Sequence, residues 1–180
     1  MGRFDGRGAI VTGGALGIGG GCARRIAADG GSVLIVDVNE SAGANTVKEI
    51  RAAGGKAEFM AGDVSKQSTA EEMVESAVSS FGRLDLLVQN AYAGADNAGS
   101  AVEVEPDNWH SGMDLLVGAL YLGAKYAVPA MIDSGDGGAI VPGPGDCLLR
   151  GAQCFRAGQT HLVAELRGAM DPRSGDIVAI

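Results

Sequence analysis

The sequence predicts an α/β domain in which a doubly wound parallel sheet is covered by helices on both faces. Short apolar runs rich in β-branched residues alternate with longer amphipathic segments, as expected of parallel strands joined by crossover helices. Glycine pairs at 30–31 and 54–55 follow two of the amphipathic segments, where glycine ends helices. The regular alternation predicts the strand order 3-2-1-4-5-6.

The first half of the chain predicts three strand–helix units. Strands are expected at 9–11, 33–36 and 56–60, and the helices that follow them at 18–29, 41–53 and 68–82. The second half predicts strands at 84–88, 139–141 and 177–180, a glycine-interrupted helical region at 106–131 and a helix at 153–170. A small, turn-rich loop at 91–99 follows the fourth strand, at the carboxyl edge where open α/β sheets bind ligands.

Length and composition indicate one globular domain over residues 1–180. With 180 residues, the chain is long enough for one substantial core and too short for two ordinary domains. Its 46% hydrophobic and 20% charged residues are typical of a globular protein. The net charge is −8, and no basic cluster is longer than Arg24 and Arg25. We therefore expect neither nucleic acid nor an acidic membrane surface as a partner.

The cysteines indicate a reducing compartment, and the apolar runs indicate a soluble, intracellular protein. Cys22, Cys147 and Cys154 have neither CxxC nor Cys/His spacing, so no metal site is expected. The first residues lack the apolar core of a signal peptide, and no uninterrupted apolar run is long enough to cross a bilayer. These features predict a cytoplasmic protein with free thiols.

A glycine-rich turn follows the first predicted strand, at residues 12–19. Gly13, Gly17 and Gly19 stand where a dinucleotide site needs a tight turn, close approach of the backbone to phosphate, and close packing of the helix on the strand. Asp37 ends the second strand about 20 residues later, where a carboxylate accepts hydrogen bonds from ribose hydroxyls. The pattern predicts that this end of the sheet binds a dinucleotide.

These motifs, in this order, resemble those of the short-chain dehydrogenase/reductase family. The glycine motif TGxxxGxG is 12–19, and the resemblance implies that Asp37 favours NAD over NADP. It also implies that Asp63 and Val64 contact adenine. The family's Asn-Asn-Ala-Gly element is matched in part by Gln89, Asn90, Ala91 and Tyr92. The implied cofactor-binding residues are Gly13, Gly17, Ile18, Gly19, Asp37, Asp63, Val64, Asn90 and Ala91.

The same resemblance implies a catalytic tetrad of Tyr, Lys, Ser and Asn, and all four positions are occupied by other residues. Phe155 stands at the Tyr position and Gln159 at the Lys position. The Ser position falls within 142–146, which contains no Ser, and Leu115 stands at the Asn position. Phe155 lacks the hydroxyl group that would exchange a proton, and Gln159 lacks the charge that would lower its pKa.

Other side chains could supply different chemistry. Tyr121 and Lys125 have the family's Tyr-x-x-x-Lys spacing but lie one element too early, where such neighbours pair routinely on a helix surface. Tyr92, Asp146 and His161 are candidates for a replacement acid–base site. Three hypotheses therefore remain: a nicotinamide-dependent oxidoreductase, a non-catalytic dinucleotide-binding or partner subunit, and a non-redox isomerase, cyclase or dehydratase.

Family members also pair through two helices, which correspond here to 109–131 and 153–170. Small residues in both segments allow close approach of helices, so a homo-oligomer is expected. Family members usually continue beyond the sixth strand into a substrate loop, another helix and a seventh strand. The given sequence ends at Ile180, so that last strand is expected to be absent from it.

Overall fold

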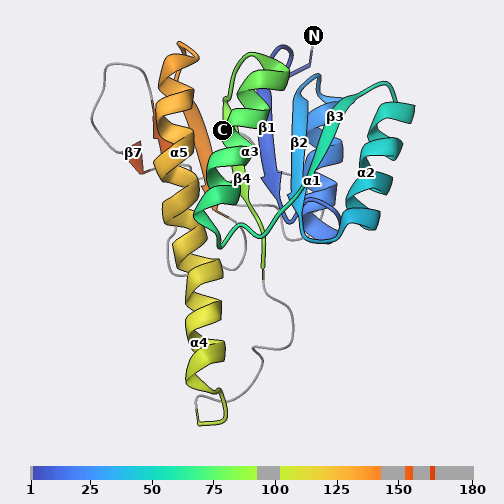
Figure 1. Cartoon of the computed structure of the whole chain (residues 1–180). Coiled ribbons are helices and arrows are strands. Elements are labelled where there is room, and N and C mark those ends of the chain that lie inside the picture. The colour runs from blue at the N-terminus through green and yellow to red at the C-terminus, as the bar shows by residue number, and fades with distance from the viewer. Residues whose placement is uncertain (1, 93–101, 143–152, 156–162, 165–180) are drawn as a thin grey trace.

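The computed structural model describes residues 2–92, 102–142, 153–155 and 163–164. These residues form a sheet of seven strands with helices on both of its faces (Figure 1). The strands are β1 (Gly8–Thr12), β2 (Ser32–Asp37), β3 (Lys56–Ala61), β4 (Leu86–Gln89), β5 (Gly138–Pro142), β6 (Gln153–Phe155) and β7 (Val163–Ala164). The helices are α1 (Gly17–Ala28), α2 (Glu40–Ala52), α3 (Gln67–Phe81), α4 (Pro106–Met113) and α5 (Ala119–Asp133).

The first five strands pair in parallel in the order β3-β2-β1-β4-β5. This confirms the predicted fold class and the strand order 3-2-1-4-5. The observed bounds of the elements up to β5 lie within two residues of the predicted ones. The agreement follows from the strong apolar patterning of this part of the chain, in which the central strands β1, β2 and β4 are largely buried.

Alternate side chains of the central strands build two separate cores. On the face covered by α3 and α5, the core contains Ile10, Leu34, Met73, Leu87 and Met131. On the face covered by α1 and α2, it contains Val11, Ile26, Val33, Ile35 and Ile50. Because successive strand residues point to opposite faces, β1 contributes to both cores and is almost completely buried.

The predicted helix at 153–170 is wrong where the structure describes that segment. Gln153–Phe155 forms β6, which pairs antiparallel with β5, and Val163–Ala164 forms β7, which pairs antiparallel with β6. Without β6, the N–H and C=O groups along one side of β5 would lack strand partners. The predicted parallel strand at 177–180 lies outside the described residues.

The helical region at 106–133 continues through the glycines that were expected to interrupt it. The π-helical turn η2 (Asp114–Gly118) joins α4 to α5, and α4 extends well beyond the sheet (Figure 1). The helical run Pro106–Asp133 has 28 residues and a mean hydropathy of 1.6 in its most apolar window. It therefore meets the length and composition of a membrane span, contrary to expectation. A mostly buried core helix passes the same test, but 22% of this window is buried inside the structure. The packed part is α5, which contacts α3, β4 and β5.

Candidate functional site

The turn between β1 and α1 has the backbone conformation that the glycine pattern predicts. Gly13 has φ of 62° and Gly17 has φ of 55°, in the left-handed region that disfavours other residues. A Cβ on Gly13 would lie 2.8 Å from Ala91 Cα and 3.1 Å from Asn90 Nδ2. The turn therefore packs directly on the residues that follow β4.

Gly19, in the first turn of α1, completes this close packing. A Cβ there would overlap the Gly13 carbonyl oxygen and lie 2.5 Å from Asn90 Nδ2. The same amide nitrogen donates a hydrogen bond to the Gly13 carbonyl oxygen at 3.2 Å. The absence of a side chain at Gly19 thus lets α1, the turn and Asn90 meet at one point.

The N-terminus of α1 is open to an anionic ligand. Within the part of the chain that the structure describes, no side chain forms a capping hydrogen bond there, and the first turn contains no acidic residue. The side chains of Leu16 and Ile18 are exposed. The first amides of a helix lack intrahelical acceptors and carry a partial positive charge, so this end of α1 suits a phosphate group.

Asp37, at the end of β2, faces the same turn. Its Oδ2 atom accepts a hydrogen bond from the Ala15 amide at 3.0 Å, and its Oδ1 atom accepts one from the Asn39 amide at 2.9 Å. Each carboxylate oxygen has a second lone pair, so two backbone bonds leave acceptor capacity. The carboxylate is therefore oriented beside the turn and able to accept from further hydroxyl groups.

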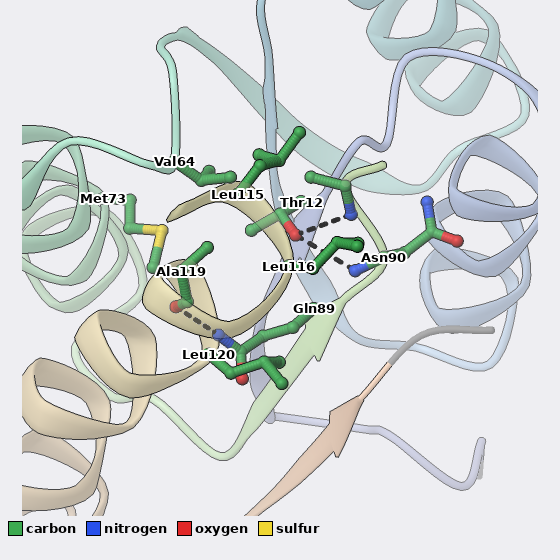
Figure 2. Close-up of a pocket in the computed structure, with 10 residues that line it drawn as sticks. Thr12, Val64, Met73, Gln89, Asn90, Leu115, Leu116, Ala119 and Leu120 are labelled. Atoms are coloured by element: carbon green, nitrogen blue, oxygen red, sulfur yellow. Dashed lines mark hydrogen bonds between the residues drawn. The ribbon is translucent and has the colours of Figure 1, made fainter. Parts of the chain in front are cut away.

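Thr12 ties the turn to the segment after β4, and our sequence analysis did not single it out as a site residue. Its hydroxyl oxygen accepts hydrogen bonds from the amides of Asn90 at 3.1 Å and Ala91 at 3.2 Å. Figure 2 shows these bonds beside the labelled side chain of Asn90. The available signal was the position of Thr12 at the end of an apolar central strand. A polar side chain buried there needs a hydrogen-bond partner.

Asp63 and Val64 follow β3 at the same edge of the sheet. Asp63 Oδ1 accepts a hydrogen bond from the Ser65 amide at 3.0 Å, and Lys66 Nζ lies 3.8 Å from Asp63 Oδ2. Burial alone would raise the pKa of Asp63, but the bonds from Ser65 and the charge of Lys66 outweigh it and lower the pKa. Asp63 is therefore an ionised acceptor, while Val64 is buried in the core.

A small cavity of about 20 Å³ lies between this edge and the π-helical turn (Figure 2), with room for about one water molecule. Leu115, which the sequence resemblance predicts at the Asn position of the tetrad, lines it with an apolar side chain. The residues around it are Thr12, Val64, Met73, Gln89, Asn90, Ala91, Leu115, Leu116, Ala119 and Leu120. The cavity thus lies beside the turn but gains no acid or base from Leu115.

Gln89, which the sequence resemblance aligns with the first Asn of the Asn-Asn-Ala-Gly element, also lines this cavity. Its Nε2 atom donates to the Ala119 carbonyl oxygen at 2.8 Å. A Cβ on Gly123 would overlap that nitrogen and lie 3.0 Å from Gln89 Cδ. The amide side chain of Gln89 therefore fits because residue 123 is glycine, and it links β4 to α5.

Of the three candidates for a replacement acid–base site, the structure describes Tyr92 alone. Tyr92 is 69% exposed and Tyr121 is 64% exposed, while Lys125 Nζ lies 5.4 Å from the ring centroid of Tyr126. Phe155 lies in β6. Asp146, Gln159 and His161 lie outside the described residues, as do residues 143–146 of the segment that covers the Ser position.

Comparison with known proteins identifies the family. The family model for short chain dehydrogenases matches residues 7–142. The chain belongs to the short-chain dehydrogenase family. The match ends at β5, so it covers the glycine turn, Asp37, Asp63 and Asn90, and it stops before the predicted Tyr and Lys positions.

Curated members of the short-chain dehydrogenase family resemble this chain over most of its length. A 2,5-dichloro-2,5-cyclohexadiene-1,4-diol dehydrogenase of Sphingobium indicum is 37% identical over 138 residues, which are 77% of this chain and 54% of that protein. A 3beta-hydroxysteroid dehydrogenase of Eggerthella lenta is 34% identical over 161 residues, 88% of this chain and 62% of that protein. The chain thus spans about half to three fifths of their length.

Solved structures of the family have the same fold. A short-chain dehydrogenase/reductase from Burkholderia phymatum, in complex with NAD, superposes with a TM-score of 0.74 at 30% identity, over 79% of this chain and 50% of that one. A second, from Burkholderia xenovorans, gives a TM-score of 0.72 at 33% identity, over 79% and 57%.

Proposed function

We propose that this member of the short-chain dehydrogenase family binds a nicotinamide dinucleotide, NAD in preference to NADP, and lacks the family's usual ketone–alcohol turnover. The glycine turn, packed on Asn90 and Ala91 with Asp37 beside it, is the observation that carries the proposal. The related structure from Burkholderia phymatum was solved with NAD. This supports the same ligand here.

The site residues fit such a ligand in chemical type. The open N-terminus of α1, with Gly17, Ile18 and Gly19 in its first turn, would hold the pyrophosphate. Asp37 would accept from the adenosine ribose hydroxyls, and its negative charge would repel the 2′-phosphate of NADP. Asp63 would accept from the adenine amino group, while Asn90 and Ala91 would line the side toward nicotinamide. When bound, the dinucleotide supplies hydride transfer.

The chain's own residues supply little of the acid–base chemistry that accompanies hydride transfer. Phe155, Gln159 and Leu115 have no ionisable group, and residues 142–146 contain no Ser. Loss of general acid–base catalysis alone costs roughly 10²–10⁴-fold in rate. This favours dinucleotide binding without ordinary redox turnover, while Tyr92, Asp146 and His161 remain the weak candidates for other chemistry.

Titration calorimetry with NAD⁺ and NADP⁺, paired with an assay of NADH oxidation against a panel of ketones, tests this proposal. We expect binding of NAD⁺, weaker binding of NADP⁺, and no ketone-dependent turnover above background. Asp37→Asn should reduce the preference for NAD⁺ by about tenfold or more, because it removes the charge that repels the 2′-phosphate.

Asp133→Asn is the matched control, since Asp133 is an exposed carboxylate at the end of α5, and it should bind as wild type does. Absence of NAD⁺ binding would refute the binding proposal. Rapid ketone reduction would refute the proposed loss of turnover, and an unchanged preference in Asp37→Asn would remove Asp37 as the discriminating residue.

We also propose that the chain self-associates through the helical region at 109–131. Trp109, Met113, Val117 and Tyr121 are exposed and repeat every four residues, so they form an apolar stripe along α4, η2 and α5. The second predicted interface helix, at 153–170, is contradicted at 153–155 and 163–164 and is not part of this proposal.

Val117→Lys should shift a dimer to a monomer in light scattering, whereas Ser111→Lys, on the opposite side of the helix, should not.

A further inference from the structure

Ala15, inside the glycine turn, is held by hydrogen bonds on both sides. Its amide donates to Asp37 Oδ2 at 3.0 Å, and its carbonyl oxygen accepts from the hydroxyl of Thr46 at 2.8 Å. Ala15 is buried. Because the amide and the carbonyl belong to the two peptide planes that flank Ala15, the two bonds together fix the orientation of both planes.

Thr46 reaches the turn from α2, thirty-one residues along the chain. Its side chain is buried, with 2% of its surface exposed. On the same hydroxyl oxygen, Arg24 Nη1 lies at 3.5 Å as a donor, and that guanidinium also pairs with Glu49 at 3.2 Å. An arginine can only donate, so the single hydroxyl hydrogen of Thr46 is directed to the Ala15 carbonyl.

This contact has a consequence for the amide that follows. The peptide bond between Ala15 and Leu16 is trans, so its N–H points away from its C=O. Since Thr46 draws the carbonyl toward α2, the Leu16 amide points to the opposite side. Leu16 is the N-cap residue of α1, and its side chain is exposed. The Leu16 amide therefore points away from α2, at the open end of α1.

We propose that Thr46 is a positioning residue for the dinucleotide site, which acts through Ala15 to aim the Leu16 amide at the pyrophosphate group. The inference rests on the proposed dinucleotide binding. Thr46 touches the turn and not the ligand, and Arg24 supports it by orienting the hydroxyl. A purely structural Thr46 would contribute to stability alone, because any satisfied buried hydroxyl does so.

Thr46→Val and Thr46→Ser separate these roles. Valine keeps the shape of threonine and removes the hydroxyl, so it leaves the Ala15 carbonyl without its side-chain donor. We expect Thr46→Val to weaken NAD⁺ binding about tenfold in calorimetry. Hydrogen exchange of amides 15–18 in the ligand-free chain should also become faster. Thr46→Ser keeps the hydroxyl and should recover most of both effects.

Ser134→Ala is the matched control for lost stability. The Ser134 hydroxyl oxygen accepts from the Leu84 amide and donates to the Ala130 carbonyl oxygen, at the amino ends of β4 and β5, away from the turn. We expect Ser134→Ala to lower the thermal midpoint without changing NAD⁺ affinity or exchange at 15–18. Equal losses of NAD⁺ affinity in Thr46→Val and Ser134→Ala would overturn the inference.

The two measurements also distinguish the inference from the proposed function. If the wild-type chain does not bind NAD⁺, the proposed function fails, and exchange at 15–18 still decides whether Thr46 orients the turn. If the wild-type chain binds NAD⁺ and Thr46→Val binds equally well with unchanged exchange, the positioning role is wrong while the proposed function stands.

Discussion

Gly19→Ala is expected to weaken NAD⁺ binding about 100-fold, or by about 2.8 kcal/mol. The new methyl group would overlap the Gly13 carbonyl oxygen and approach Asn90 Nδ2 to 2.5 Å. Neither neighbour can move away freely. The Gly13 carbonyl oxygen is backbone, and Asn90 Nδ2 is hydrogen-bonded to it. The turn must therefore move, and its amides move with it. Calorimetry with NAD⁺ measures the loss.

Gly21→Ala is the matched control, because it adds the same methyl group two residues further along α1. Within the described part of the chain, nothing lies within 4 Å of a Cβ at Gly21. Alanine there should leave NAD⁺ affinity unchanged and raise stability by up to about 1 kcal/mol, since glycine disfavours helix interiors. Wild-type affinity in a folded Gly19→Ala variant would contradict the close packing at Gly19.

Patterns that repeat along the chain predicted the sheet and the turn. β1 and β2 are short apolar runs, so their residue types are enough to locate these two strands. The glycines of the turn have backbone conformations or close neighbours that exclude a side chain, so the glycine pattern is enough to locate the turn. Asp37 was predicted from its distance along the chain, and the structure places it beside the turn. Its role toward a ligand stays a prediction until binding is measured.

Hydrogen bonds between distant segments escaped the sequence analysis. Thr12 bonds to Asn90, 78 positions away, and Thr46 bonds to Ala15, 31 positions away. An isolated threonine gives no repeating pattern from which to infer such a partner. The glycines at 112, 118 and 123 were expected to interrupt a helix that in fact continues through a π-helical turn. Gly123 instead makes room for Gln89, a pairing that depends on how α5 docks on β4.

The helix expected at 153–170 failed for a related reason. Apolar residues spaced as on a helix do not exclude strands in so short a segment. The secondary structure of Gln153–Phe155 is instead determined by β5, whose outer edge pairs with this segment as β6. An available sheet edge is a property of the assembled fold and not of the local sequence, so the error arises where tertiary pairing overrides local preference.

Asp85→Asn is expected to lower the free energy of unfolding by about 3 kcal/mol, because it breaks a buried charge cluster. The Asp85 side chain is 8% exposed and lies at the amino end of the sheet. It accepts hydrogen bonds from Arg83 at 2.6 and 2.7 Å, from Arg7 at 2.7 Å and from the Gly8 amide at 2.9 Å. Asparagine would remove the buried one of the two carboxylates that pair with both arginines, the other being the exposed Asp136, and present an N–H₂ group among donors.

Asp29→Asn is the matched control for this change. Asp29 also pairs with two arginines, Arg3 and Arg25, but these ion pairs lie at the surface. Exposed ion pairs contribute little, because water and salt screen them, so Asp29→Asn should shift the urea midpoint much less than Asp85→Asn. Equal shifts in the two variants would show that burial of the Asp85 cluster adds no stability.

The effect of Asp85 should also depend on pH in a definite direction. Burial alone would raise the pKa of Asp85, but bonds from Arg83, Arg7 and the Gly8 amide outweigh it and lower the pKa below the ordinary value of 3.8. The folded state then binds fewer protons than the unfolded state at pH values near and between the folded and unfolded pKa values. The stabilisation is complete above the unfolded pKa and is lost as pH falls through the folded pKa.

Urea unfolding of wild type and Asp85→Asn at about pH 7 and about pH 3 measures this loss. The difference in free energy between the two proteins should be largest near pH 7 and shrink at the lower pH, where the unfolded wild-type chain binds a proton at Asp85 more readily than the folded chain does. Asp29 and Asp63 also have lowered pKa values, but they are present in both proteins and cancel in the difference. A difference that stays constant with pH would mean that the arginines are held by Asp136 and not by the charge of Asp85, since Asp136 bonds to both of them.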